Sequence, residues 1–130
     1  MSPKPDEVGG RRAKMSRPFH LITITLLLAV SSLSAATHYV SLGSTNPTPP
    51  FASWATAATS IQFAVNVAAA NDVVLVTNGV YPGNVSVTKP LTLRSVNGPQ
   101  FTIINGGGTN WCVFLTNGAS LTGFTLTKGV

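Results

Sequence analysis

Side chains that carry catalytic or metal chemistry are scarce in this sequence of 130 residues. After residue 36 it contains one acidic side chain, Asp72, one histidine, His38, and one cysteine, Cys112. Two-carboxylate catalysis needs a second acid beside the first, Ca²⁺ prefers about six to eight oxygen ligands, and structural Zn²⁺ takes about four nitrogen or sulfur ligands. The sequence therefore predicts no catalytic residue, no metal site and no cofactor. We expect no enzyme activity from this chain alone.

The positive charge is concentrated at the N-terminus. The formal net charge is +5, and five of the eight cations are Lys4, Arg11, Arg12, Lys14 and Arg17. Residues 37–130 carry only Lys89, Arg94 and Lys128 against the single acid. A surface that follows a nucleic-acid backbone needs many clustered Lys and Arg side chains. The charge pattern therefore excludes a nucleic-acid partner.

Three side chains are candidates for contact with a glycan, namely Trp54, Trp111 and Arg94. Trp54, with the nearby Phe51 and Tyr39, could form a platform that stacks on a sugar ring, and Arg94 could pair with an acidic polysaccharide. Trp111 follows three consecutive glycines, a corner that favours exposure. The competing interpretation is that both tryptophans pack on the core and that the arginine is simply solvated.

The first 36 residues have the pattern of a signal peptide. Basic residues precede a ten-residue apolar core at 21–30, and the small residues SSLSAA follow it at 31–36. A stable transmembrane helix needs about 20 apolar residues, so this core is too short to be one. We expect cleavage after Ala35 or Ala36 and a secreted or cell-surface protein. Because Met15 opens a complete signal peptide by itself, residues 1–14 are candidates for an extension upstream of the true start.

The body, residues 37–130, begins with a predicted helix over 60–70. Apolar residues recur there on one helical face, from Ile61 to Ala69, and Thr59 or Ser60 can cap its N-terminus. From residue 73 the pattern changes to short apolar runs, at 73–76, 84–87, 91–95, 101–104, 111–115 and 121–126. Four Asn-Gly pairs, which suit tight corners, lie between these runs.

Two architectures fit short strands at this spacing. In an antiparallel sandwich the Asn-Gly pairs would close hairpins, and in a parallel β-helix they would form corners between the faces of a coil. The consecutive apolar positions, the variable linkers and a helix placed to cover one end of the core favour the β-helix. Asparagines at such corners could form a ladder that binds sugar hydroxyls, although satisfying the turns is the favoured interpretation.

Three segments carry a family resemblance: SWATAATSIQ before the helix, VVLVTNGVY after it, and VTKPLTLRSVNG followed by TIING. They resemble the N-terminal entry of the pectin-lyase-like superfamily, many of whose members are large secreted or surface proteins of bacteria. The resemblance implies an all-β fold, an incomplete right-handed parallel β-helix of a few coils over residues 37–130, with one short N-terminal capping α-helix. This chain departs from the pattern at Phe63 and Asn66, where relatives often have Asp, and at Asn71, where they often have Gly.

The resemblance also implies a function. We expect the non-catalytic N-terminal portion of a secreted or cell-surface β-helix protein, a scaffold or a glycan-interacting module whose partner is extracellular polysaccharide or cell-surface material. The alternative is the N-terminal fragment of a polysaccharide lyase or pectin-esterase-like enzyme whose active site lies on later coils absent here. The sequence stops directly after a strand-like run, without a C-terminal cap, so we expect self-association through the exposed last coil.

Overall fold

Short parallel strands and one α-helix make up the part of the chain that the structure, a computed structural model, describes: residues 34–116 and 118–130. The predicted signal peptide falls almost wholly outside these residues. The helix α1 spans Ile61–Val67, and a 3₁₀ turn, η2, spans Trp54–Thr56. The strands are β1 (Thr37–Val40), β2 (Val73–Val76), β3 (Gly79–Pro82), β4 (Val85–Val87), β5 (Thr92–Ser95), β6 (Thr102–Asn105), β7 (Val113–Leu115), β8 (Ser120–Thr122) and β9 (Thr125–Thr127).

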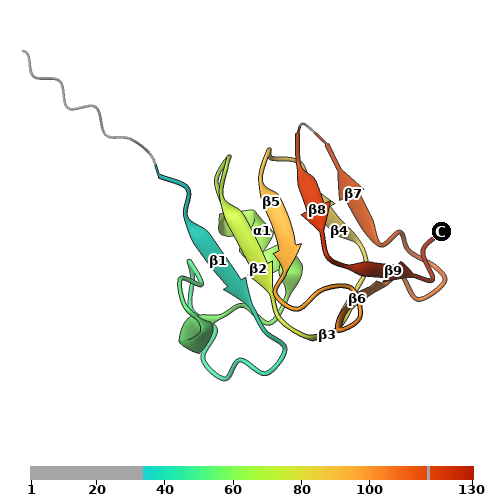
Figure 1. The fold of residues 1–130 in the computed structure, drawn as a ribbon, viewed down its shortest axis with the longest axis horizontal. Coiled ribbons are helices and arrows are strands. Elements are labelled where there is room, and N and C mark those ends of the chain that lie inside the picture. The colour runs from blue at the N-terminus through green and yellow to red at the C-terminus, as the bar shows by residue number, and fades with distance from the viewer. Residues whose placement is uncertain (1–33, 117) are drawn as a thin grey trace, which may run out of the picture. The chain divides into compact units, whose positions relative to one another are not determined.

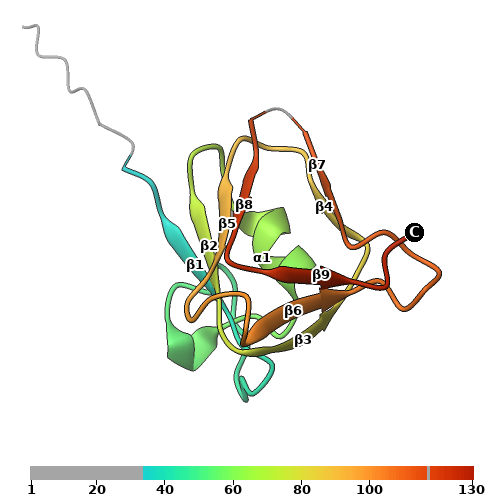
Figure 2. The same ribbon diagram turned by 45° about the vertical axis from the view of Figure 1, so that its right-hand side comes forward.

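The strands form three sheets, and every pairing between strands is parallel. The first sheet has the order β1-β2-β5-β8, the second β3-β6-β9 and the third β4-β7. The chain passes from the first sheet to the second, then to the third, and returns to the first one strand further along (Figure 1). Viewed obliquely, the three sheets lie as three sides around a shared interior (Figure 2). The predicted parallel pairing is confirmed, and hairpins closed by the Asn-Gly pairs are excluded.

Most of the predicted runs are strands, with two instructive differences. The run at 73–76 is β2 without change, but the run at 121–126 divides into β8 and β9. Gly123, between these two strands, adopts a φ of 82°, which turns the chain from one sheet to the next. Strand β3 was not predicted as a separate strand, because it begins at Gly79, inside an Asn-Gly pair interpreted as a turn.

The helix is shorter than its apolar pattern predicts. It begins after Ser60, as expected, but it ends at Val67, and Ala68 already has extended backbone angles. The N–H of Ala69 donates to the Asp72 carboxylate, and the Lys89 ammonium donates to the carbonyl of Ala68. These bonds supply partners outside the helix, so the apolar spacing at 68 and 69 does not extend it.

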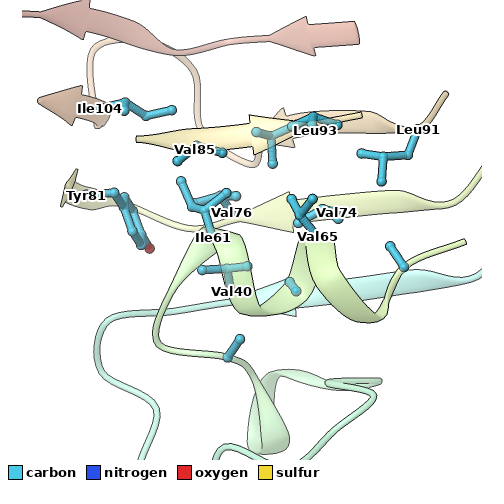
Figure 3. Packing of buried hydrophobic residues seen from close by; sticks show 14 of the residues in the cluster. Val40, Ile61, Val65, Val74, Val76, Tyr81, Val85, Leu91, Leu93 and Ile104 are labelled. Carbon is cyan, nitrogen blue, oxygen red and sulfur yellow. The ribbon is translucent and has the colours of Figure 1, made fainter. Parts of the chain in front are cut away.

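Alternate residues of the strands point inward and form one core. In the first sheet, the inward positions of β2 and β5 include Val74, Val76 and Leu93, all fully buried. Ile61 and Val65 of the helix belong to the same cluster (Figure 3). Cys112 is also buried in it. The interior is therefore filled by side chains of all three sheets and the helix.

The N-terminal end of the strand stack is covered along the outer edges of β1 and β4. On the outer edge of β1, the amides of Tyr39 and Ser41 donate to the carbonyls of Phe51 and Ala58, each at 2.8 Å. On the outer edge of β4, the side-chain amide of Gln62 accepts from the N–H of Ser86 at 2.7 Å and donates to its carbonyl at 3.1 Å. A backbone segment and one helix side chain thus replace the missing neighbouring strands.

The C-terminal end is open. Within the described residues, β7, β8 and β9 are the last strands of their sheets. Leu126 pairs in register with the buried Ile104, and Leu115 pairs with the buried Val87, so both leucines point inward. Nevertheless, Leu126 is 49% exposed and Leu115 is 38% exposed. Core positions at this end therefore face solvent.

Three glycines stack at the corner between the second and third sheets. A methyl group added at Gly83 would lie 3.0 Å from the Cα of Gly106, and one added at Gly106 would lie 2.9 Å from the Cα of Gly129. The second distance is shorter than real contacts of this kind, and the first is tighter than nine in ten of them. The corner therefore requires glycine because backbones of successive circuits touch there.

We expect Gly106→Ala to lower the free energy of unfolding by roughly 1–3 kcal/mol, because the new methyl group must push apart packed backbone. The matched control is Gly43→Ala, where the nearest atom would be 4.0 Å away and the φ angle is not positive. Urea unfolding followed by circular dichroism measures both variants. Equal stability of the two variants would contradict the stacked corner.

Candidate functional site

Two of the predicted glycan contacts lie on the outer face of the first sheet. The rings of Tyr39 and Trp54 meet edge to face, with centroids 4.6 Å apart. Tyr39 pairs in register with Leu75, and Leu75 pairs with Arg94. Because neighbouring strands are about 4.8 Å apart, Arg94 lies roughly 10 Å along the sheet from Tyr39. The structure thus brings Trp54 and Arg94 onto one surface, which we call the outer row: Trp54, Tyr39, Leu75 and Arg94.

The outer row combines an aromatic surface with a cation. Trp54 packs on Tyr39 and is still 44% exposed. Arg94 is exposed on the same face. An exposed ring can stack on the apolar face of a sugar, and a guanidinium can pair with a carboxylate in two-pronged fashion.

Trp111 is on a different surface. It is half exposed, and its ring lies 6.3 Å from that of Phe114, which is also half exposed on β7 of the third sheet. The carbonyl of Trp111 accepts the N–H of Asn84, which fixes this loop beside β4. The structure therefore does not bring Trp111 together with Trp54 and Arg94.

The Asn-Gly corners include one rung of a side-chain ladder. The amide nitrogen of Asn97 donates to the amide oxygen of Asn78 at 2.7 Å, across successive corners between the first and second sheets. These amide groups bind each other and are exposed to solvent at the same time. The hydrogen bond between the two side chains stabilises these corners, and this structural role is sufficient to explain why the two asparagines lie together.

A buried pair of titratable side chains, His38 and Asp72, was not predicted from the sequence. Nε2 of His38 lies 2.8 Å from Oδ2 of Asp72, and Nδ1 lies 2.7 Å from the carbonyl oxygen of Pro50. The two side chains are 6% and 9% exposed. Each is the only residue of its type after residue 36 and borders an apolar strand, which was the available signal, but a separation of 34 residues hid the contact.

The Asp72 carboxylate holds three segments together. Besides His38, it accepts the N–H of Ala36, before β1, at 2.9 Å and that of Ala69, after α1, at 2.8 Å. Burial of this carboxylate raises its pKa, but the hydrogen bonds from Ala69, His38 and Ala36 outweigh burial and bring the pKa of Asp72 from 3.8 to about 2. Asp72 is therefore ionised at any ordinary pH.

The pair lacks what catalysis would need. In a catalytic triad, one imidazole nitrogen binds the carboxylate and the other faces a nucleophile. Here the second nitrogen binds a backbone carbonyl, and both side chains are buried. The described residues also contain no group of three or more His, Cys, Asp or Glu side chains placed to hold a metal ion. The arrangement can fix the backbone but cannot attack a substrate.

No helix within residues 34–116 and 118–130 is long and apolar enough to cross a membrane. No family model, curated protein or solved structure matches this chain. The resemblance to the pectin-lyase-like superfamily therefore rests on the sequence segments that carry it.

We expect the free energy of unfolding to fall at acidic pH as Asp72 becomes protonated. Its folded-state pKa lies below its ordinary value, so the stabilisation is complete above pH 3.8 and is lost as pH falls through about 2. The difference between the folded-state pKa of Asp72 and its ordinary value corresponds to about 2 kcal/mol in the free energy of unfolding. Urea unfolding at several pH values should show this loss in the unaltered chain.

The control for this experiment is Asp72→Asn, which keeps the shape of the side chain and removes its charge. We expect this variant to be less stable near neutral pH. The loss of stability between about pH 4 and pH 2 should be smaller in the variant than in the unaltered chain, by about 2 kcal/mol. Parallel curves for the two proteins would show that Asp72 is not the group responsible.

Proposed function

We propose that this chain is the non-catalytic N-terminal portion of a secreted or cell-surface protein built on a right-handed parallel β-helix, in which it acts as a scaffold. The observation that carries the proposal is the difference between the two ends of the strand stack. One end is closed by the 51–58 segment, the helix and Gln62, and the other leaves inward leucines and strand edges free.

The path of the chain supports the β-helix. Each circuit adds parallel strands in register to strands of the circuit before it, as when Thr92 pairs with Val73 and Ser120 pairs with Thr92. A stack of this kind buries its core only where a neighbouring circuit or a cap covers it. An open end with exposed core leucines is therefore suited to receive further circuits.

The use of the ionisable groups supports a non-catalytic role for this chain. Asp72 and His38, the acid and the histidine of the described residues, are both buried and bind backbone groups. The alternative proposal is that a longer parent is an extracellular polysaccharide lyase or pectin-esterase-like enzyme. In that case the catalytic carboxylates would lie on later coils, and this portion would serve the same scaffolding role.

The scaffold proposal predicts self-association of the purified chain through its open end. Sedimentation velocity should show oligomers, because association covers the exposed leucines and strand edges. Leu115→Lys combined with Leu126→Lys should shift the chain toward monomer, since charge at inward positions opposes burial. The matched control is Val80→Lys on β3, because Val80 is 54% exposed but points outward.

Oligomers that persist in the leucine variant and disappear in the Val80→Lys control would place the contact elsewhere. A monodisperse monomer of the unaltered chain, with a cooperative unfolding transition, would show that the open end needs no cover. Either result would count against the scaffold proposal.

The outer row favours a second role, contact with an acidic polysaccharide. We expect Trp54→Ala and Arg94→Gln each to weaken retention of the chain in a gel containing polygalacturonate by several-fold, through loss of stacking and of charge pairing. The control is Phe63→Ala, since Phe63 is 56% exposed on the helix rather than on the first sheet. Equal retention of all three variants would remove the outer row as a binding surface. No unsaturated product or methanol should form in these samples.

A further inference from the structure

Both ring nitrogens of His38 face oxygen atoms that can only accept a hydrogen bond. One is the peptide carbonyl of Pro50, and the other is the carboxylate of Asp72. A neutral imidazole carries a single N–H, so it would leave one nitrogen lone pair directed at an oxygen lone pair. With Asp72 ionised, only the doubly protonated imidazolium donates to both partners, so the geometry points to that form.

The Pro50 contact belongs to the segment that closes the N-terminal end. Phe51, the next residue, is buried, and its carbonyl accepts the N–H of Tyr39 on the outer edge of β1. The N–H of Phe51 donates to Thr48, and that of Thr48 donates to Thr56. The bond from His38 to Pro50 therefore ties the covering segment to β1 directly beside the backbone bond that satisfies its edge.

We propose that His38 is a proton-operated latch: its imidazolium form holds the 48–58 segment over the edge of β1, and loss of one proton loosens this cover. While the ring is doubly protonated, the cover is closed. As the pH rises, one of the two hydrogen bonds is lost and the neutral ring no longer balances the charge of Asp72. The edge of β1, which can otherwise pair with another strand, then becomes accessible.

Asp72 is the only titratable group within the described residues that contacts His38. Segment 41–58, helix α1 and strand β2 carry no ionisable side chain that faces it. Lys89 binds the carbonyls of Asn66 and Ala68 at the neighbouring turn and contacts neither member of the pair. Since Asp72 stays ionised throughout, the direction of the switch is set by His38 alone.

Hydrogen–deuterium exchange of the full-length chain, read by mass spectrometry, tests the latch. The reporter is a peptide that spans 38–51, and the reference is a peptide that includes β6. After correction for the intrinsic effect of pH on amide exchange, raising the pH from about 5.5 to about 8.5 should lower protection of the reporter relative to the reference by about 10-fold. This is the size expected for losing one hydrogen bond to a charged group.

The matched variant is Asp72→Asn. Its amide nitrogen, in place of Oδ2, can donate to Nε2 of a neutral imidazole, which leaves the Nδ1–H free to donate to Pro50 at both pH values. The same nitrogen cannot accept the N–H of Ala69, but the loss of that bond is the same at both pH values. Protection of the reporter should then change less than about 3-fold with pH. The latch is wrong if the unaltered chain shows no relative loss of protection, or if the variant keeps the full pH effect.

A measurement on the native site guards against misfolding of that variant. In a His20→Gln chain, His38 is the only histidine, so its two ring ¹⁵N shifts can be read without ambiguity. We expect both nitrogens to be protonated at about pH 5.5 and one to lose its proton over the pH range in which protection falls. A neutral ring at about pH 5.5 in the protected state would overturn the proposal, as would a ring that stays doubly protonated while protection falls.

Discussion

Every strand in a parallel stack needs a partner for its edge, and this requirement governs how the chain is arranged. Within the stack, strands of successive circuits satisfy one another. Within the residues that the structure describes, no circuit precedes the first strands, and the edges of β1 and β4 obtain their partners in two different ways. The carbonyls of Phe51 and Ala58 pair with β1, and the side chain of Gln62 pairs with Ser86 of β4. The helix is therefore more than a lid on the core, since it also supplies the hydrogen-bonding groups of a missing strand.

The same end of the molecule depends on one buried carboxylate. An ionised group away from water is costly unless it is well paired and hydrogen-bonded. Asp72 meets that condition with the N–H groups of Ala36 and Ala69 and with the His38 ring. These partners come from before β1, from β1 itself and from the exit of the helix. A single ionic cluster thus fixes the relative positions of the elements that close the stack.

Much of the architecture could be predicted because it depends on local patterns. The apolar run of β2, the start of the helix at Ile61 and the corners at the Asn-Gly pairs all follow from residue type and spacing. The end of the helix could not be read in the same way, because Ala68 and Ala69 fit the apolar face, while the side chains of Asp72 and Lys89 bind their backbone groups outside the helix. The His38–Asp72 pair and the glycine stack were missed for the same physical reason. They form only when segments far apart in the sequence are folded together.

The candidate site was predicted in its residues but not in its geometry. Trp54 and Arg94 are 40 residues apart in the sequence, and only the pairing of β1, β2 and β5 places them on one face. Trp111 was predicted with them and lies on the third sheet, because the path of the chain, and not the type of side chain, decides which surface a residue joins.

The burial of Asp72 also changes the character of the outer surface. It is the only acidic side chain of residues 37–130, so Arg94 and Lys128, which are exposed, and Lys89, which is partly exposed, have no opposing carboxylate side chain on the surface of this part. The buried carboxylate is hydrogen-bonded to the His38 ring and to two backbone N–H groups. Three separated cations are too few to hold a polyanion by charge alone, because exposed ionic contacts contribute little and are screened by salt. Recognition of an acidic glycan by this surface would therefore have to combine Arg94 with stacking on Trp54, which is the combination that the outer row provides.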